Sequence, residues 1–222
     1  MSGLSFKKLN GGAKKSEVKY MKLAEGDNTF RIAPDSVLPG YTYWVKGKNG
    51  KDFPFDALQF DRENERFDNK LPCPIRDLEI KDKKGDDLRC QWSYKCQVIN
   101  KATGQVEILQ LKKGMLSEII SVAQDLEVDP TDLDTGMWLT VTRTKTGPLA
   151  YNVEYKLRQL KCKPSALSDE EKELFAKAKT ITELFKPETY DEQLARLNKH
   201  INGEQDEESN ASDDQEAIDE LS

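Results

Sequence analysis

The stretch Leu88–Asn100, LRCQWSYKCQVIN, and the following Gln105–Lys112, QVEILQLK, decide the fold class of this chain. In the first stretch apolar and polar side chains alternate, which is the pattern of a β-strand with one buried face. The apolar set is Cys90, Trp92, Tyr94, Cys96 and Val98, and the polar set is Arg89, Gln91, Ser93, Lys95 and Gln97. Because a short Lys-Ala-Thr-Gly turn joins the two stretches, together they predict a β-hairpin.

A helix and a second hairpin are predicted downstream. Met115–Leu126 carries apolar residues at helical spacing. Met137–Thr144 (MWLTVTRT) and Leu149–Leu157 (LAYNVEYKL) read as two strands joined by a Lys-Thr-Gly-Pro turn.

Upstream, two further strands and an insertion are predicted. Asn28–Ala33 (NTFRIA) alternates and is expected to stop at Pro34, and Tyr41–Lys46 (YTYWVK) is an aromatic-rich second strand. Lys51–Asp87 is expected to form a long, partly helical insertion or loop region. The order strand, strand, insertion, hairpin, helix, hairpin predicts a mainly β chain with an OB-fold-like Greek-key barrel, and a β-sandwich is the nearest alternative.

The C-terminal part differs in composition from this β region. A capping-box sequence, Ser168-Asp-Glu-Glu171, predicts a helix to about Lys179, and Thr189–Ile201 predicts a second amphipathic helix. Gly203–Ser222 holds nine acids and no lysine or arginine, so we expect it to be disordered. The predicted organisation is a flexible basic arm (1–20), an OB-fold-like nucleic-acid-binding core (21–163), a helical extension (164–202) and a disordered acidic tail (203–222).

The acidic tail hides the charge of the remainder. The formal charge of the whole chain is −6, but residues 1–202 have 34 basic and 31 acidic residues, a charge of +3. Residues 1–163 have 28 basic and 23 acidic residues, a charge of +5. A mildly basic body with an acidic tail can bind a polyanion, while the tail competes with that polyanion or recruits partners.

The sequence gives little support to enzymatic chemistry. A single histidine, His200, removes most Ser-His and Cys-His arrangements, and no phosphate-binding glycine loop is present. The four cysteines are separated by gaps of 16, 5 and 65 residues, which do not match the usual zinc-ligand pairs, so free thiols are favoured over a metal site. We therefore expect no enzyme activity, no cofactor and no metal, although counting carboxylates does not exclude a metal-dependent nuclease.

The chain is expected to be soluble and to have no membrane partner. No apolar run approaches the roughly 18 residues that cross a bilayer, and the N-terminal stretch lacks the apolar segment of a secretory signal.

Aromatic and basic residues are interleaved along the chain, as expected of a surface that binds an unpaired nucleic-acid strand. Cations follow the phosphates of such a strand, and flat side chains stack on its bases. The candidates are Tyr41, Tyr43, Trp44, Lys46, Lys48, Lys51, Phe53, Phe55, Arg62, Arg66, Arg89, Lys95, Arg143 and Lys145.

Many of these rings are expected in the core, because aromatic residues on one strand face are usually buried. Trp92 and Tyr94 are assigned to the core for this reason. Tyr43 and Trp44 are adjacent and point to opposite faces, so one of them is exposed. Tyr41 and Tyr43 share a face and are the preferred stacking residues.

Several short stretches resemble the phage single-stranded DNA-binding proteins, in particular the T-even helix-destabilising protein family. The stretches are Phe6–Asn10 (FKKLN), Gly26–Pro34 (GDNTFRIAP), Cys73-Pro74, Gly104–Ile119 and the acidic ending with Ile218 and Leu221. The resemblance implies an OB-fold, DNA binding that tolerates any sequence, roles in replication, recombination and repair in the cytoplasm of an infected bacterium, and self-association along DNA through the N-terminal arm. Zinc-binding members have a close Cys-x-x-Cys pair; here Arg76 replaces its second cysteine, so the resemblance is to a zinc-less variant.

The end of the tail combines acids with isolated aliphatic residues, which a purely solubilising segment does not need. Such a segment can dock into a basic-rimmed apolar pocket of another protein or lie over the cationic groove of its own body. In the resembling family, such a tail recruits replication and recombination proteins. The candidate partner-binding residues are Asp213, Asp214, Glu216, Ile218, Asp219, Glu220 and Leu221.

The leading hypothesis is a non-enzymatic phage protein that binds single-stranded DNA without sequence preference. An alternative from another class is an acidic adaptor or DNA mimic that binds a replication or host protein. A metal-dependent nuclease is the third possibility, which incubation of DNA with Mg²⁺ or Mn²⁺ separates from a binding protein.

Deleting Gly203–Ser222 is predicted to tighten binding of oligo-dT at low salt, because it removes nine carboxylates that compete with phosphates. Electrophoretic mobility shift at two salt concentrations measures this effect. Unchanged or weaker binding by the shortened chain contradicts tail competition.

Overall fold

A computed structural model describes residues 18–149 and 152–203. Its strands are β1 (Gly26–Lys46), β2 (Asp52–Asp56), β3 (Phe60–Asp61), β4 (Arg66–Phe67), β5 (Gln91–Asn100), β6 (Gln105–Leu111), β7 (Met137–Lys145), β8 (Val153–Leu157) and β9 (Lys163–Pro164). Its helices are α1 (Pro74–Asp77), α2 (Lys113–Asp125), α3 (Asp169–Lys177), α4 (Ile181–Leu184) and α5 (Tyr190–Asn202), with a short 3-10 turn at Gln159–Lys161. Most of the predicted arm and nearly all of the predicted tail lie outside the described residues.

The described strands form a mainly antiparallel β structure. One seven-stranded sheet has the order β6-β5-β1-β7-β8, with β2 also paired to β1 and β9 to β7, and β3 and β4 form a separate pair. The predicted hairpins β5–β6 and β7–β8 are confirmed, and α2 lies between them in the chain as predicted. A mainly β chain with this strand order is compatible with the predicted OB-like fold.

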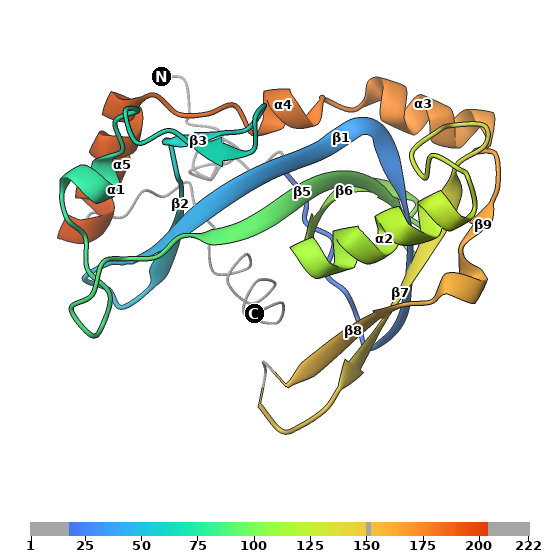
Figure 1. Ribbon diagram of the computed structural model, residues 1–222, viewed down its shortest axis with the longest axis horizontal. Helices are drawn as coiled ribbons and strands as arrows, with labels where there is room; N and C mark the ends of the chain where they lie inside the picture. Colours follow the sequence, from blue (N-terminus) through green and yellow to red (C-terminus); the bar gives the residue numbers. More distant parts are fainter. Residues whose placement is uncertain (1–17, 150–151, 204–222) are drawn as a thin grey trace, which may run out of the picture.

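The two strands expected on either side of Pro34 are one long, bent strand, β1 (Figure 1). Its register with β5 shifts between Ile32 and Val37, so Pro34 falls in a β-bulge, and Asp35 adopts a φ of 50° there. A bulge leaves residues outside the hydrogen-bond ladder, so a proline without an N–H donor is tolerated. The prediction that Pro34 ends the strand is therefore wrong.

The predicted insertion contains a strand that its sequence did not reveal. β2 pairs with the second half of β1, with Trp44 opposite Pro54 and Tyr43 opposite Phe55. Its sequence, DFPFD, contains a proline and two acids, which argue against a strand. Because β2 pairs only with β1, it is an edge strand, where proline is accepted.

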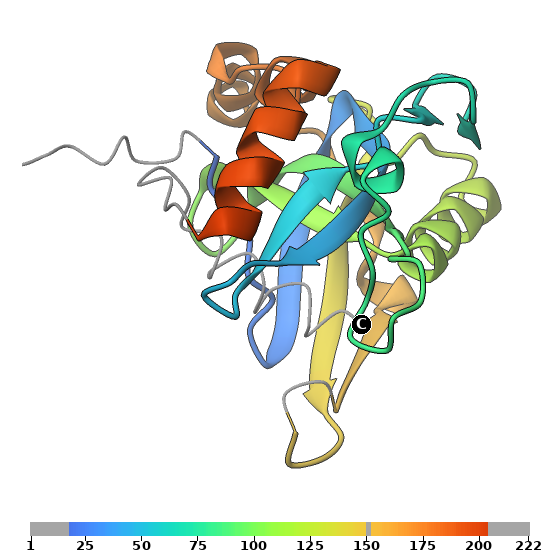
Figure 2. The ribbon, with the colours of Figure 1, turned by 90° about the vertical axis from the view of Figure 1, so that its left-hand side faces the viewer.

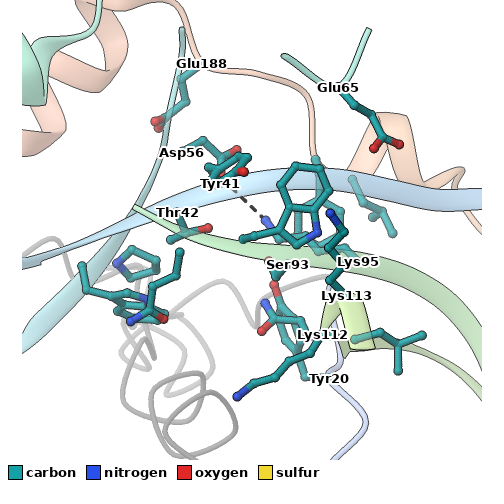
Figure 3. A pocket seen from close by; sticks show the side chains of 18 of the residues that line it. Tyr20, Tyr41, Thr42, Asp56, Glu65, Ser93, Lys95, Lys112, Lys113 and Glu188 are labelled. Carbon is teal, nitrogen blue, oxygen red and sulfur yellow. Dashed lines mark ion pairs between the residues drawn. The ribbon is translucent and has the colours of Figure 1, made fainter. Parts of the chain in front are cut away.

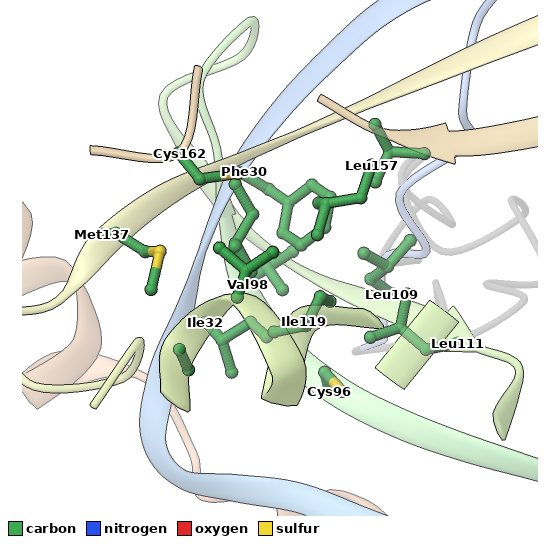
Figure 4. Close-up of a cluster of buried hydrophobic side chains, with 14 of the residues drawn as sticks. Phe30, Ile32, Cys96, Val98, Leu109, Leu111, Ile119, Met137, Leu157 and Cys162 are labelled. Atoms are coloured by element: carbon green, nitrogen blue, oxygen red, sulfur yellow. The ribbon is translucent and has the colours of Figure 1, made fainter. Parts of the chain in front are cut away.

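The larger core lies between the sheet and α2 (Figure 4). Phe30 and Ile32 from β1, Val98 from β5 and Leu139 from β7 point into it and are buried. α2 contributes Ile119 to the same core. The alternating pattern of β5 thus has its apolar face inside, as expected.

A smaller core lies between β1, β2 and α5, and it includes Tyr43, Val45, Phe55 and Leu197. The Tyr43 hydroxyl accepts a hydrogen bond of 2.7 Å from the Gln59 amide. Burial raises the pKa of Tyr43 to about 12.

The C-terminal helices are packed on this body. α3, α4 and α5 each begin with a capping box, and they follow one another along one side of the molecule (Figures 1 and 2). Gln193 in α5 donates a 2.9 Å hydrogen bond to the carbonyl of Asp56, and the His200 ring nitrogen lies 2.8 Å from the carbonyl oxygen of Val45. α5 therefore covers β2 and the second half of β1. Among the described helices, none combines the length and apolar character of a membrane span.

A buried guanidinium connects β1 to the loop before β7 and to the residue after β9. Arg31 is 0% exposed, and it donates hydrogen bonds to the carbonyls of Asp132 and Ser165. Burial lowers the pKa of Arg31, while nearby carboxylates oppose that shift. Gly136 lies against this contact, because a β-carbon there would be 2.5 Å from the guanidinium and 2.4 Å from the carbonyl oxygen of Asp132.

Gly136→Ala is predicted to lower the free energy of unfolding by about 1–3 kcal/mol, since the added methyl group overfills a packed site. Urea unfolding followed by circular dichroism measures the change. Gly114→Ala is the matched control, because nothing lies within 4 Å of its added β-carbon and alanine is favoured in helices. Equal stability of the two variants contradicts the packing described around Arg31.

Tyr43 is predicted to remain protonated at about pH 11, where an ordinary tyrosine is mostly ionised. Burial favours the neutral phenol, so its contribution to stability is present below pH 10 and is lost as the pH rises toward 12. The phenolate absorbance of the folded protein minus that of Tyr43→Phe measures this ionisation. An ionisation midpoint near 10 in that difference contradicts the buried position.

Candidate nucleic-acid interface

An open groove with a volume of about 1070 Å³ lies beside the paired ends of β1 and β5 (Figure 3). Its lining comes mainly from β1, β5, the junction of β6 with α2, and the segment from Leu184 to Arg196. Further lining residues are Tyr20, Pro54 and Asp56 of β2, and Glu65. β5 extends beyond the last residue of β6, since Tyr94 pairs with Leu111 and Gln91 to Ser93 have no partner in β6. α2 begins directly after β6, so its first residues also border the groove.

Aromatic rings gather at one end of the groove. Tyr41 is the cross-strand partner of Trp92, and their ring centroids are 4.7 Å apart. Phe60 and Phe67 of the β3–β4 hairpin pack against Tyr41, with centroids 4.8 and 4.5 Å from that of Tyr41, but they do not line the groove. Trp44 lines the groove from the same strand as Tyr41. The groove thus combines a sheet floor with rings that are not fully buried.

Three lysines of the groove, Lys112, Lys113 and Lys186, form no ion pair with any residue that the structure describes. Lys112 and Lys113 stand at the start of α2, whose first turn has no acidic residue and whose N-cap makes no side-chain hydrogen bond. The positive end of the helix dipole adds to their charge. Partial burial lowers the pKa of Lys112. This side of the groove is suited to anions.

Other cations of this region hold the C-terminal segment against the sheet. Asp56 pairs with Arg62 at 2.8 Å and with Lys95 at 3.7 Å. Lys95 also lies 4.4 Å from the centroid of the Phe185 ring, and Arg62 donates a 2.8 Å hydrogen bond to the Phe185 carbonyl. These contacts give Arg62 and Lys95 a structural role at the groove wall.

The opposite wall carries a further ion pair and the acidic part of the groove. Arg196 pairs with Glu188 at 2.6 Å and lies 4.3 Å from the centroid of the Phe55 ring. With Asp56 and Glu65, the groove has three carboxylates and five cationic side chains, so its net charge is positive. In Figure 3, Glu65 and Glu188 lie toward one rim, and Lys112 and Lys113 toward the other.

Of the residues predicted to bind nucleic acid, Tyr41, Trp44 and Lys95 line the groove. Tyr43 is only 7% exposed and Phe55 only 1%, so both rings belong to the smaller core. This corrects the expectation that Tyr41 and Tyr43 stack together on bases. The physical reason is α5, which covers the face of β1 and β2 that carries Tyr43 and Phe55.

The other residues that were predicted to bind DNA do not line the groove. Lys46, Lys48, Lys51, Arg66, Arg89 and Lys145 are exposed elsewhere, Phe53 is half-buried beneath Arg196, and Arg143 donates a hydrogen bond to the Tyr155 hydroxyl. Arg143 and Lys145 belong to the end of β7 that leads into the β7–β8 turn, and neither lines the groove. The predicted partner-binding residues, Asp213 to Leu221, lie outside the described part of the chain.

Several groove residues were absent from the sequence-based candidates. Trp92 packs against both cores, in line with its predicted core position, but it is only half-buried and also borders the groove. Tyr94 is buried as expected. The sequence could have indicated Lys112 and Lys113. Two lysines at the start of a helix interact unfavourably with its dipole, and no acid in the first turn compensates them, which suggests an anion-binding role. Phe185 and Lys186 carried no such signal, because only the packing of α4 and α5 brings them here.

The cysteines do not form a metal site within residues 18–149 and 152–203. No group of three or more histidine, cysteine, aspartate or glutamate side chains there is arranged to hold a metal ion. Cys73, Cys96 and Cys162 are buried thiols, and Cys90 is half-buried.

Comparison with known proteins gives a relative from a bacteriophage. No family model matches the chain. Over 156 residues it is 26% identical to a protein of Escherichia phage T5 named "Probable ssDNA-binding protein". The match covers 67% of this chain and 58% of the T5 protein, so this chain spans less than two thirds of its relative. The chain is therefore similar to a phage protein of that name, and this likeness does not single out the T-even family.

Proposed function

We propose that this chain is a non-enzymatic protein that binds single-stranded DNA without reading its sequence. The observation that carries the proposal is the groove, in which unpaired lysines stand beside partly exposed aromatic rings on an OB-like sheet. OB-folds commonly bind oligonucleotides on their second and third strands, which correspond here to β5 and β6.

The two kinds of side chain have separate tasks in this proposal. Lys112, Lys113 and Lys186 attract the phosphates, whose neutralisation releases counterions and makes binding dependent on salt. Tyr41 and Trp92 offer rings to the bases, and stacking contributes about 1–3 kcal/mol per base whatever the base is. No base-specific donor or acceptor pattern is required, so binding tolerates any sequence.

The arrangement of the walls favours one strand over a duplex. Stacking on Tyr41 or Trp92 requires bases whose faces are free, and these are hidden in a duplex. The carboxylate of Glu65 at one rim would repel a second phosphate backbone placed beside the first, whereas Glu188 is already paired with Arg196.

The T5 relative supports this class of function, because its printed name refers to single-stranded DNA. Within the proposal, the chain acts in replication, recombination and repair of phage DNA in the cytoplasm of the infected bacterium. The acidic tail competes with DNA and recruits proteins of those processes, and the N-terminal arm joins neighbouring copies along the strand. The division into arm, core, helical extension and tail is part of the same proposal.

Lys112→Ala/Lys113→Ala is predicted to weaken oligo-dT binding at least tenfold in low salt. The slope of log affinity against log salt should become shallower by about 1.4, because each lost phosphate contact on a single strand contributes about 0.7. Fluorescence anisotropy of labelled oligo-dT at several salt concentrations measures both values.

Lys83→Ala/Lys84→Ala is the matched control, because it removes two positive charges from an exposed turn outside the groove. The control should change affinity less than twofold. If both double variants behave alike, the effect comes from total charge and the groove assignment is wrong.

A further inference from the structure

A second cluster of an aromatic ring with basic residues lies outside the groove, around Trp138 in β7. The Lys101 ammonium lies 5.1 Å from the centroid of the Trp138 ring. Lys163 in β9 is the cross-strand partner of Trp138, so the two side chains share a face. Trp138 is half-buried, and both lysines are exposed.

Trp138 stands on the outer face of β7. Its neighbours Met137 and Leu139 are fully buried in the larger core, so the side chain between them points away from that core. Thr140 is two residues after Trp138 and therefore shares its face, and its hydroxyl lies at hydrogen-bond distance, 3.0 Å, from that of Thr29. The ring therefore lies at the surface where β7 meets the first half of β1.

Additional cations lie along this face. The Arg158 backbone N–H donates a 2.8 Å hydrogen bond to the Thr140 carbonyl, which places Arg158 beside the same stretch of β7. Lys161 follows in the 3-10 turn and pairs with Asp27. Within residues 18–149 and 152–203, Lys101, Arg158 and Lys163 form no ion pair.

Packing alone accounts for one lysine covering the tryptophan, but not for a second lysine, Lys163, on the same face without an ion pair to a described residue. Arg158 adds positive charge nearby, where it helps Lys161 to lower the pKa of Asp27. A partly exposed ring beside cations that form no ion pair is the combination that holds single-stranded nucleic acid by stacking and phosphate attraction. The same combination forms the groove, which Trp138 does not line.

The groove and this cluster lie at opposite ends of one strand. Tyr41 and Trp44 are near the end of β1, whereas Thr29, which accepts a hydrogen bond from the Lys101 backbone, is near its start. Along a straight strand Thr29 and Thr42 would be on the order of 40 Å apart, and the bend in β1 makes the actual distance shorter. A short oligonucleotide in the groove would leave the cluster empty, while a longer strand could reach both.

We propose that Trp138, Lys101, Arg158 and Lys163 form a second contact for single-stranded DNA, used by the part of a long strand that extends beyond the groove. This inference rests on the proposed function of the groove. The second contact forms intramolecularly once the groove is filled, so it raises affinity for long strands in particular.

The first test compares two lengths of oligo-dT, about 6 and about 30 nucleotides, with the full-length chain. Lys101→Glu/Lys163→Glu should bind the short oligonucleotide within twofold of the unaltered protein and the long one about tenfold more weakly. Lys83→Glu/Lys84→Glu is the control with the same change of charge on an exposed turn.

Trp138 fluorescence provides a direct second readout. The chain has three tryptophans, so Trp44→Phe/Trp92→Phe leaves Trp138 as the only one while keeping rings in the groove. The long oligonucleotide should quench Trp138 emission, and the short one should leave it unchanged.

The outcomes separate the two proposals. If the unaltered protein binds neither oligonucleotide, the proposed function fails and the second contact fails with it. If it binds both, but Lys101→Glu/Lys163→Glu matches its control on the long oligonucleotide and Trp138 emission does not change, only the second contact is overturned.

Discussion

The pairing of β1 with three other strands is the constraint on which the rest of the structure depends. Its first half pairs with β5 and β7 and supplies the larger core, and its second half pairs with β5 and β2 and supplies the smaller core and the groove. The β-bulge between Ile32 and Val37 lets one chain segment serve both parts, because it bends the strand without ending it. A shift of register in either half would turn Phe30 or Tyr43 away from its core.

The C-terminal helices pack against the β structure, and the segment between α4 and α5 forms one wall of the groove. Asp56 in β2 is shared by Arg62 and Lys95, and these cations in turn hold Phe185 in place. Anchoring of α5 by Leu197 and Gln193 fixes the far wall. The cations nearest the sheet are therefore occupied by the protein itself, so the proposed phosphate contacts fall to the lysines at the start of α2 and before α5.

Local sequence patterns predicted the regular elements well and the site only partly. The alternating pattern correctly predicted β5 as a strand and identified its buried face, and the helical spacing correctly predicted α2. Pro34 was wrongly predicted to end a strand, because the bulge at this position does not need its missing N–H. The strand β2 was missed because an edge strand tolerates Pro54. Alternation shows which side chains share a face but not what covers that face. Tyr43 and Phe55 were taken for stacking rings because the packing of α5, more than 130 residues away along the chain, leaves no local trace.

The most direct test of the account is ultraviolet cross-linking of the full-length protein to a short oligo-dT, with the attached residues identified by mass spectrometry. Attachment is expected within β1 and β5, at Tyr41, Trp44 or Trp92, and unlabelled oligo-dT should protect these sites. Attachment confined to segments outside the groove, or no saturable attachment in dilute buffer, would contradict this expectation.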